Sequence, residues 1–225
     1  MIETLQQIAI WSLPILFAIT AHEAAHAWVA LQLGDNTAQR LGRVTLNPIK
    51  HIDLMGTVIL PVLTLVTMGL AFGWAKPVLV NWHNLRQPRR DMALVAIAGP
   101  GANLLMAILW AIVAKLGWLV ATQFEPALFF VYMGGAGILI NAILMIFNLI
   151  PILPLDGGRV LYSVLPPSLA KPFGLLDSYF GLLIVVVLVI LTPLKNLLIP
   201  LVKLMYEQLA WLVGMHEPLL ALIGW

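Results

Sequence analysis

The first apolar stretch of the chain, residues 5–33, is LQQIAIWSLPILFAITAHEAAHAWVALQL. It is long enough to cross a bilayer, because a spanning helix needs about 20 predominantly apolar residues. The run Gly-Asp-Asn follows it at residues 34–36, and these residue types end helices and begin turns. The sequence therefore predicts a membrane helix that carries three ionisable residues, His22, Glu23 and His26, in its apolar interior.

The overall composition is that of a membrane protein. Of the 225 residues, 61% are hydrophobic and 10% are charged, and the mean hydropathy is +0.98. A soluble domain usually has about a quarter of its residues charged, so this composition excludes a water-soluble globule. The net charge of +2 is too small to indicate a nucleic-acid partner. There is no cysteine, which excludes disulfides, iron-sulfur clusters and thiolate zinc sites, and any metal must be held by His, Asp or Glu.

Four more apolar runs follow, at residues 54–72, 92–120, about 128–150 and about 175–198. They predict an all-α polytopic membrane protein. A tail from Lys195 has polar residues near helical spacing, which predicts either an amphipathic interfacial helix or a further span. We treat residues 1–225 as one integral-membrane domain, with a core at about 5–165 and a C-terminal helix and tail at 170–225.

The placement of lysine and arginine predicts the orientation, because cytoplasmic loops are enriched in these residues. None occurs in the first 39 residues, three lie at 34–53, four at 73–91 and none at 116–158. The first helix then runs from outside to inside. If both basic stretches are cytoplasmic, residues 54–72 cannot cross the membrane fully and form a re-entrant segment.

The motif His22-Glu23-Ala24-Ala25-His26 predicts a metal site. Residues four apart share a helix face, so both imidazoles can reach one metal with Glu23 beside it. Metallopeptidases use two such histidines and a glutamate that takes a proton from the attacking water. An ionised side chain at the centre of a membrane helix costs about 2.5–3.5 kcal/mol and is functional by default; a structural His-Glu pair is the alternative. The motif lies about 12 Å from the end of the helix.

A catalytic zinc site usually has a third protein ligand, and Asp156 is the best candidate. It follows Pro151 and Pro154, which cannot continue a helix. Irregular backbone at membrane depth occurs where protein buries it or a watery cavity hydrates it. The order of the membrane spans also predicts that Asp156 lies on the same side of the membrane as the end of the first helix. The alternative is a loop that caps a helix at the membrane interface.

Three motifs, taken in order, resemble the site-2 protease family of intramembrane zinc metalloproteases. They are HEAAH at 22–26, AGPGAN at 98–103 and NLIPILPLDGG at 148–158. The resemblance implies one zinc ion per chain, with His22, His26 and Asp156 as its ligands and Glu23 as the catalytic acid and base. It also implies that Asn148 lies beside the site and helps to hold substrate or the developing oxyanion. Asn103 either hydrogen-bonds across helices or helps to bind substrate.

The family's central module has three helices, matched here by the first helix and by residues 92–120 and 128–150. The chain has no room for the PDZ or CBS domains of larger members. Members also place extended segments beside the active site. The strand-like residues Ala75 to Val80 are our candidate for a segment that pairs with an unwound substrate, and an interfacial loop anchored by Trp74 and Trp82 is the alternative.

The resemblance implies hydrolysis of a peptide bond in a transmembrane or membrane-inserted substrate helix, near the cytoplasmic side of a prokaryotic cell membrane, as in regulated intramembrane proteolysis. One alternative is a metal or ion transporter that uses His22, Glu23, His26 and Asp156 as a transit site. Transporters often contain internal repeats with paired broken helices, of which this sequence has only a faint echo. The other alternative is an inactive homologue that binds membrane proteins, against which the intact Glu23 argues. The sequence leaves the oligomeric state open.

Overall fold

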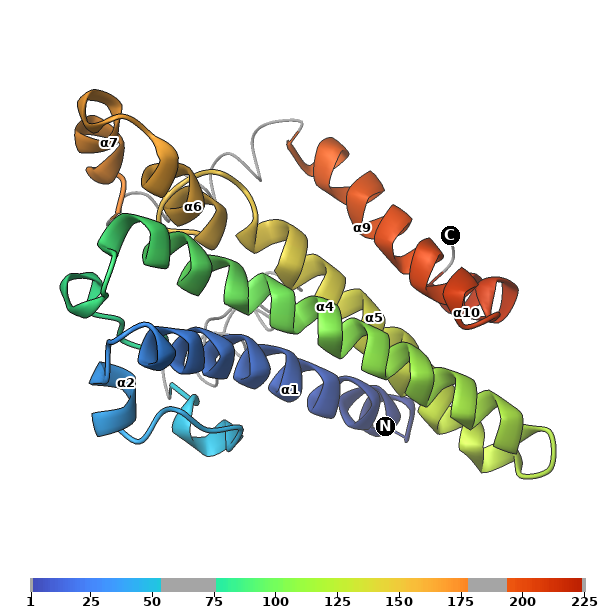
Figure 1. Ribbon diagram of the computed structural model, residues 1–225. Helices are drawn as coiled ribbons and strands as arrows, with labels where there is room; N and C mark the ends of the chain where they lie inside the picture. Colours follow the sequence, from blue (N-terminus) through green and yellow to red (C-terminus); the bar gives the residue numbers. More distant parts are fainter. Residues whose placement is uncertain (1, 54–75, 178–193, 224–225) are drawn as a thin grey trace.

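Three long helices run side by side in the computed structural model, which describes residues 2–53, 76–177 and 194–223 (Figure 1). They are α1 (Ile2–Gln32), α4 (Pro88–Ala121) and α5 (Leu128–Asn148). All three are long and apolar enough to cross a membrane. The predicted all-α membrane fold is thus confirmed. The apolar run at 54–72 and most of the run at 175–198 lie outside the described residues.

Helix α4 begins four residues before the predicted start at Met92, at Pro88. Its first residue is a proline, which is well tolerated in the first turn of a helix because its missing N–H needs no partner there. The Asp91 carboxylate accepts a hydrogen bond of 2.8 Å from the Gln87 backbone N–H, and this bond stabilises the N-terminus of α4.

Small residues allow α4 and α5 to pack closely. A Cβ atom added to Gly134 would lie 2.6 Å from the Cβ of Ala114, and one added to Gly137 would lie 2.2 Å from the ring of Trp110. Close approach at small residues is the usual way in which membrane helices associate. The α4–α5 pair therefore forms the rigid centre of the molecule.

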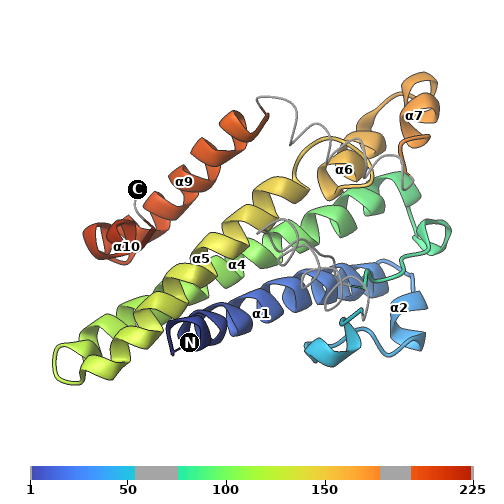
Figure 2. The same ribbon diagram turned by 180° about the vertical axis from the view of Figure 1, so that it is seen from behind.

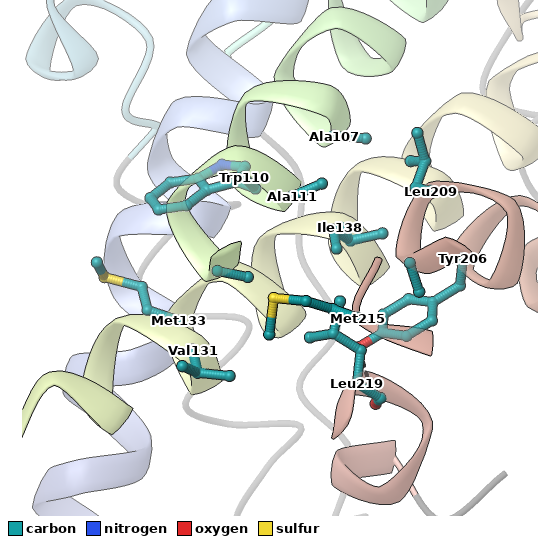
Figure 3. Close-up of a cluster of buried hydrophobic side chains, with 12 residues drawn as sticks. Ala107, Trp110, Ala111, Val131, Met133, Ile138, Tyr206, Leu209, Met215 and Leu219 are labelled. Carbon is teal, nitrogen blue, oxygen red and sulfur yellow. Dashed lines mark hydrogen bonds between the residues drawn. The ribbon is translucent and has the colours of Figure 1, made fainter. Parts of the chain in front are cut away.

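The C-terminal helices α9 (Leu194–Leu212) and α10 (His216–Ile223) pack on α5. Tyr206, Met215 and Leu219 are fully buried in this contact, together with Ile138 of α5 (Figure 3). Helix α9 lies on one side of α5 and α1 on the other, as both views show (Figures 1 and 2). The tail thus packs on α5 and, to a smaller extent, on α4.

Short elements gather where α1 ends, α4 begins and α5 ends (Figure 1). They are α2 (Thr37–Arg40), η1 (Pro48–Lys50), η3 (Trp82–Asn84), α6 (Asp156–Val164) and α7 (Pro167–Gly174), while η4 (Glu125–Ala127) lies at the opposite end of the bundle. In this group, the Arg159 guanidinium makes two hydrogen bonds to the Asp177 carboxylate, at 3.1 and 3.0 Å. It also stacks 4.8 Å from the ring centre of Trp82.

Candidate metal centre

Helix α1 presents two imidazoles to the interior of the bundle, one turn apart. The Nε2 atoms of His22 and His26 lie 3.0 Å from each other. The two rings are nearly perpendicular, with centres 4.6 Å apart. The spacing of four residues in the motif therefore produces the shared face that it predicts.

The Asp156 side chain lies beside these two imidazoles, although it is 130 residues or more away in the sequence. Its Oδ2 atom lies 3.3 Å from Nε2 of His22 and 3.4 Å from Nε2 of His26. The three side chains are only 10–12% exposed. Among the described residues, they are the one group of metal-ligating side chains whose ligand atoms converge in this way.

The chain segment before Asp156 explains this placement. Helix α5 ends at Asn148, residues 149–155 form irregular turns, and α6 begins at Asp156 itself. Glycine is required at the next two positions, because a Cβ on Gly157 would lie 2.2 Å from the Leu149 carbonyl oxygen and one on Gly158 would lie 2.3 Å from the backbone of Ile152. The predicted break at the prolines is confirmed, and the Gly-Gly pair lets α6 fold back on that break.

Hydrogen bonds at the far side of each ring fix the imidazole tautomers. Nδ1 of His26 lies 2.7 Å from the Val95 carbonyl oxygen, which can only accept, so this nitrogen carries the proton. Nδ1 of His22 lies 2.6 Å from Oδ1 of Asn103 and donates to it in the same way. In neutral imidazoles, both Nε2 atoms are then unprotonated and turn their lone pairs toward Asp156.

This arrangement fits a cation. Among the residues that the structure describes, none makes a hydrogen bond to the buried Asp156 Oδ2, and this oxygen faces two nitrogen lone pairs at 3.3 and 3.4 Å. Three acceptors that converge without a proton between them repel one another unless a positive ion lies among them. Zinc bonds of about 2.0–2.2 Å at tetrahedral angles place ligand atoms about 3.3 Å apart. The donor set and its spacing therefore match a His-His-Asp zinc site.

Helix α4 packs directly against the two imidazoles at Gly99. A Cβ added there would lie 2.3 Å from Nε2 of His26 and 2.6 Å from Cε1 of His22. Only glycine leaves room for the two imidazoles at this crossing of α1 and α4.

Asn103 connects all three long helices. Its Nδ2 donates to the Ala18 carbonyl of α1 at 3.1 Å and to Oδ1 of Asn141 in α5 at 2.9 Å. Asn141 in turn donates to the Gly137 carbonyl at 2.8 Å. Both asparagines are fully buried. Of the two roles that the sequence leaves open for Asn103, the structure shows the hydrogen bonds across helices, and its oxygen faces His22.

Asn148 ends α5, eight residues before Asp156. Its side chain is half-buried and donates to the Leu144 carbonyl of its own helix at 2.9 Å. Its predicted place beside the site stays a prediction. His51 is also buried, and its Nε2 lies 3.0 Å from the Thr45 carbonyl oxygen.

Glu23 lies next to His22 and meets a segment far away in the sequence. Its Oε2 accepts a hydrogen bond of 2.7 Å from the Val78 backbone N–H. Residues 76–81 are not helical, and Val78 and Val80 are half-buried between exposed neighbours, an alternation typical of an extended chain. Residues 76–80 of the predicted strand-like segment thus lie against the motif helix, while Trp74 and Ala75 are outside the described residues.

Comparison with known proteins agrees with this geometry. The chain is 38% identical over 188 residues to the "Putative zinc metalloprotease YwhC" of Bacillus subtilis, and the match covers 81% of this chain and 80% of that protein. The chain belongs to the site-2 protease family of zinc metalloproteases. A second member, the "Putative zinc metalloprotease Rip2" of Mycolicibacterium smegmatis, is 34% identical over 80% of this chain and 66% of its own length.

The Rip2 protein of Mycobacterium tuberculosis is 30% identical over 68% of this chain and 55% of its own length. No family model matches the sequence. No solved structure matches it either. Membership of this zinc metalloprotease family agrees with a metal centre made of two histidines and one aspartate.

Proposed function

We propose that this site-2 protease family member is an intramembrane zinc endopeptidase that cuts a membrane-inserted substrate helix. The observation that carries the proposal is the convergence of His22, His26 and Asp156 inside the helix bundle, with three ligand atoms 3.0–3.4 Å apart. One zinc ion per chain, held by these residues, would polarise the scissile carbonyl and make water a better nucleophile.

Glu23 is the proposed acid and base. It follows a proposed ligand, His22, directly in the sequence, and its carboxylate accepts a hydrogen bond from the Val78 N–H. A carboxylate so placed takes the proton from the attacking water and returns it to the leaving amine. Proton transfer by a positioned side chain contributes about 10²- to 10⁴-fold to the rate.

The depth of the site supports a substrate within the membrane. His22 and His26 lie in the apolar part of α1, about 15 Å and about 9 Å from the end of that helix at Gln32. The basic residues beyond this end support its placement on the cytoplasmic side. A peptide bond inside an intact helix is shielded, so the substrate unwinds locally. Residues 76–80, the described part of the predicted segment Ala75 to Val80, are a candidate to pair with it.

The test uses proteoliposomes that contain the protein, zinc and a fluorescent transmembrane substrate. Wild type is expected to cleave the substrate, and Glu23→Gln is expected to bind zinc equally well and cleave at least about 100-fold more slowly. Zinc flux across the same membranes is measured in parallel. Equal cleavage by both proteins, or zinc transport without cleavage, would show that the proposal is wrong.

A further inference from the structure

The peptide group between Pro77 and Val78 is bound at both of its polar atoms. Its N–H donates to Oε2 of Glu23 at 2.7 Å, and its carbonyl oxygen accepts from Nη1 of Arg43 at 2.8 Å. The N–H and C=O of a trans peptide point in opposite directions. Glu23 and Arg43 therefore hold this peptide from opposite sides, and a displacement of either contact changes the other.

A glycine turn brings Arg43 to this place. Gly42 has a φ of 66°, in the left-handed region. The N–H of Gly42 donates to the Gln39 carbonyl and that of Arg43 to the Ala38 carbonyl, both at 2.9 Å. These paired bonds are the glycine-terminated end of a helix, here α2, and they direct the chain at Arg43 toward Pro77.

The same device at the end of α1 places Asp35. Gly34 has a φ of 117°, and the Asp35 N–H donates to the Ala30 carbonyl at 2.9 Å. The Asp35 carboxylate, fully buried, accepts from the Asn81 N–H at 2.8 Å and from Nδ2 of Asn84 at 2.9 Å. Asp35 thus holds the far end of the segment that Arg43 holds at its start.

We propose that Asp35 and Arg43 are positioning residues, which fix the segment Pro77–Asn81 so that the Val78 N–H orients the carboxylate of Glu23. The inference rests on the proposed function, in which Glu23 moves the proton. Glu23 has three rotatable side-chain bonds, and a donor bound to one of its oxygens selects one orientation among many. The donor is the Val78 N–H, which lies outside α1. Its position therefore depends on the turns at Gly34 and Gly42, which place Asp35 and Arg43.

The proposal is tested by amide hydrogen exchange at Val78, measured in the full-length protein without substrate. Glu23→Ala removes the acceptor, and the Val78 amide is expected to exchange about tenfold faster or more. Arg43→Met is expected to raise the exchange rate in the same direction, and Arg43→Lys, which keeps a donor, is expected to restore part of the protection. Arg40→Met is the matched control, because Arg40 is exposed and is the last residue of α2, three positions before Arg43.

Kinetics separate positioning from general loss of structure. Arg43→Met and Asp35→Asn are expected to lower kcat about 10- to 100-fold, with KM changed less than about threefold and zinc content unchanged. Arg40→Met is expected to match wild type. Unchanged Val78 exchange in Glu23→Ala or Arg43→Met, or normal kcat with faster exchange, would overturn the positioning role. If the wild-type protein cleaves no substrate, the proposed function is wrong. The exchange rate of the Val78 amide tests the positioning role separately, because it is measured without substrate.

Discussion

Nδ1 of His22 lies 2.6 Å from Oδ1 of Asn103, and this contact determines which imidazole nitrogen faces the candidate metal centre. Asn103 is itself held by Ala18 and Asn141, so the three long helices jointly orient one ligand. Groups that hydrogen-bond to a metal-ligating histidine raise its basicity and fix its ring, and their loss typically costs 10- to 100-fold in metal affinity.

Asn103→Ala is therefore expected to weaken zinc binding about 10- to 100-fold. The measurement is competition with a zinc chelator of known affinity. Asn141→Ala is the control, because it leaves the contact between Asn103 and His22 in place and is expected to have a smaller effect. Equal zinc affinity of Asn103→Ala and wild type would contradict the role that the contact implies.

Gly99→Ala is expected to abolish zinc binding, because the new Cβ would lie 2.3 Å from Nε2 of His26. Gly101→Ala is the matched control in the same helix, since no atom of the described part of the chain lies within 4 Å of its added Cβ. Bound zinc is measured by elemental analysis, and folding by circular dichroism in detergent. Wild-type zinc content in Gly99→Ala would mean that α1 and α4 do not cross as described.

Asp35 makes stability depend on pH. Burial alone would raise the pKa of Asp35, but hydrogen bonds from Thr37, Asn84 and Asn81 outweigh it and hold the pKa below the usual value of 3.8. A depressed pKa in the folded state stabilises the protein above the usual carboxyl pKa, and this contribution is lost as the pH falls through the folded value.

Asp35→Asn is therefore expected to unfold more easily at neutral pH, by about 1–3 kcal/mol. The difference from wild type should shrink as the pH falls below about 4. Thermal unfolding in detergent across this pH range provides the measurement. A difference that stays constant, or grows in acid, would be inconsistent with a stabilising Asp35 carboxylate.

The orientation can be tested by chemical labelling, because the chain has no native cysteine. Gln87, just before α4, and Gln123, just after it, are both exposed in the structure. A single cysteine at position 87 is expected to react from the cytoplasmic side, and one at position 123 from the outside. The reverse pattern would invert the proposed orientation of the metal centre.

The sequence predicted the three long helices and the residues that converge at the candidate metal centre for a physical reason. A membrane segment must satisfy its backbone hydrogen bonds internally, so apolar runs of this length become helices. Ionisable residues at membrane depth are costly, and few interrupt these runs, so His22, Glu23 and His26 stand out. The prolines and glycines around Asp156 marked the break in the same way.

The contacts that orient the site could not be predicted from the sequence. The contact of His26 with Val95 uses a backbone carbonyl, which any residue at that position would supply. The contact of Arg43 with Pro77 joins residues 34 positions apart. Asp35 was interpreted only as turn chemistry after the first helix. Its role becomes visible when the turn and the segment around Asn81 lie side by side. Gly34-Asp35 and Gly42-Arg43 do share a pattern, a glycine followed by a charged residue, but its meaning depends on the fold.

The central claim is that His22, His26 and Asp156 form one buried zinc site, and X-ray absorption at the zinc edge tests it most directly. Wild type is expected to bind one zinc ion per chain, with two imidazole nitrogens and carboxylate oxygen at about 2.0–2.2 Å. Asp156→Ala is expected to lose the carboxylate oxygen from this shell and most of its zinc affinity. An unchanged spectrum and wild-type affinity in Asp156→Ala would contradict the assignment.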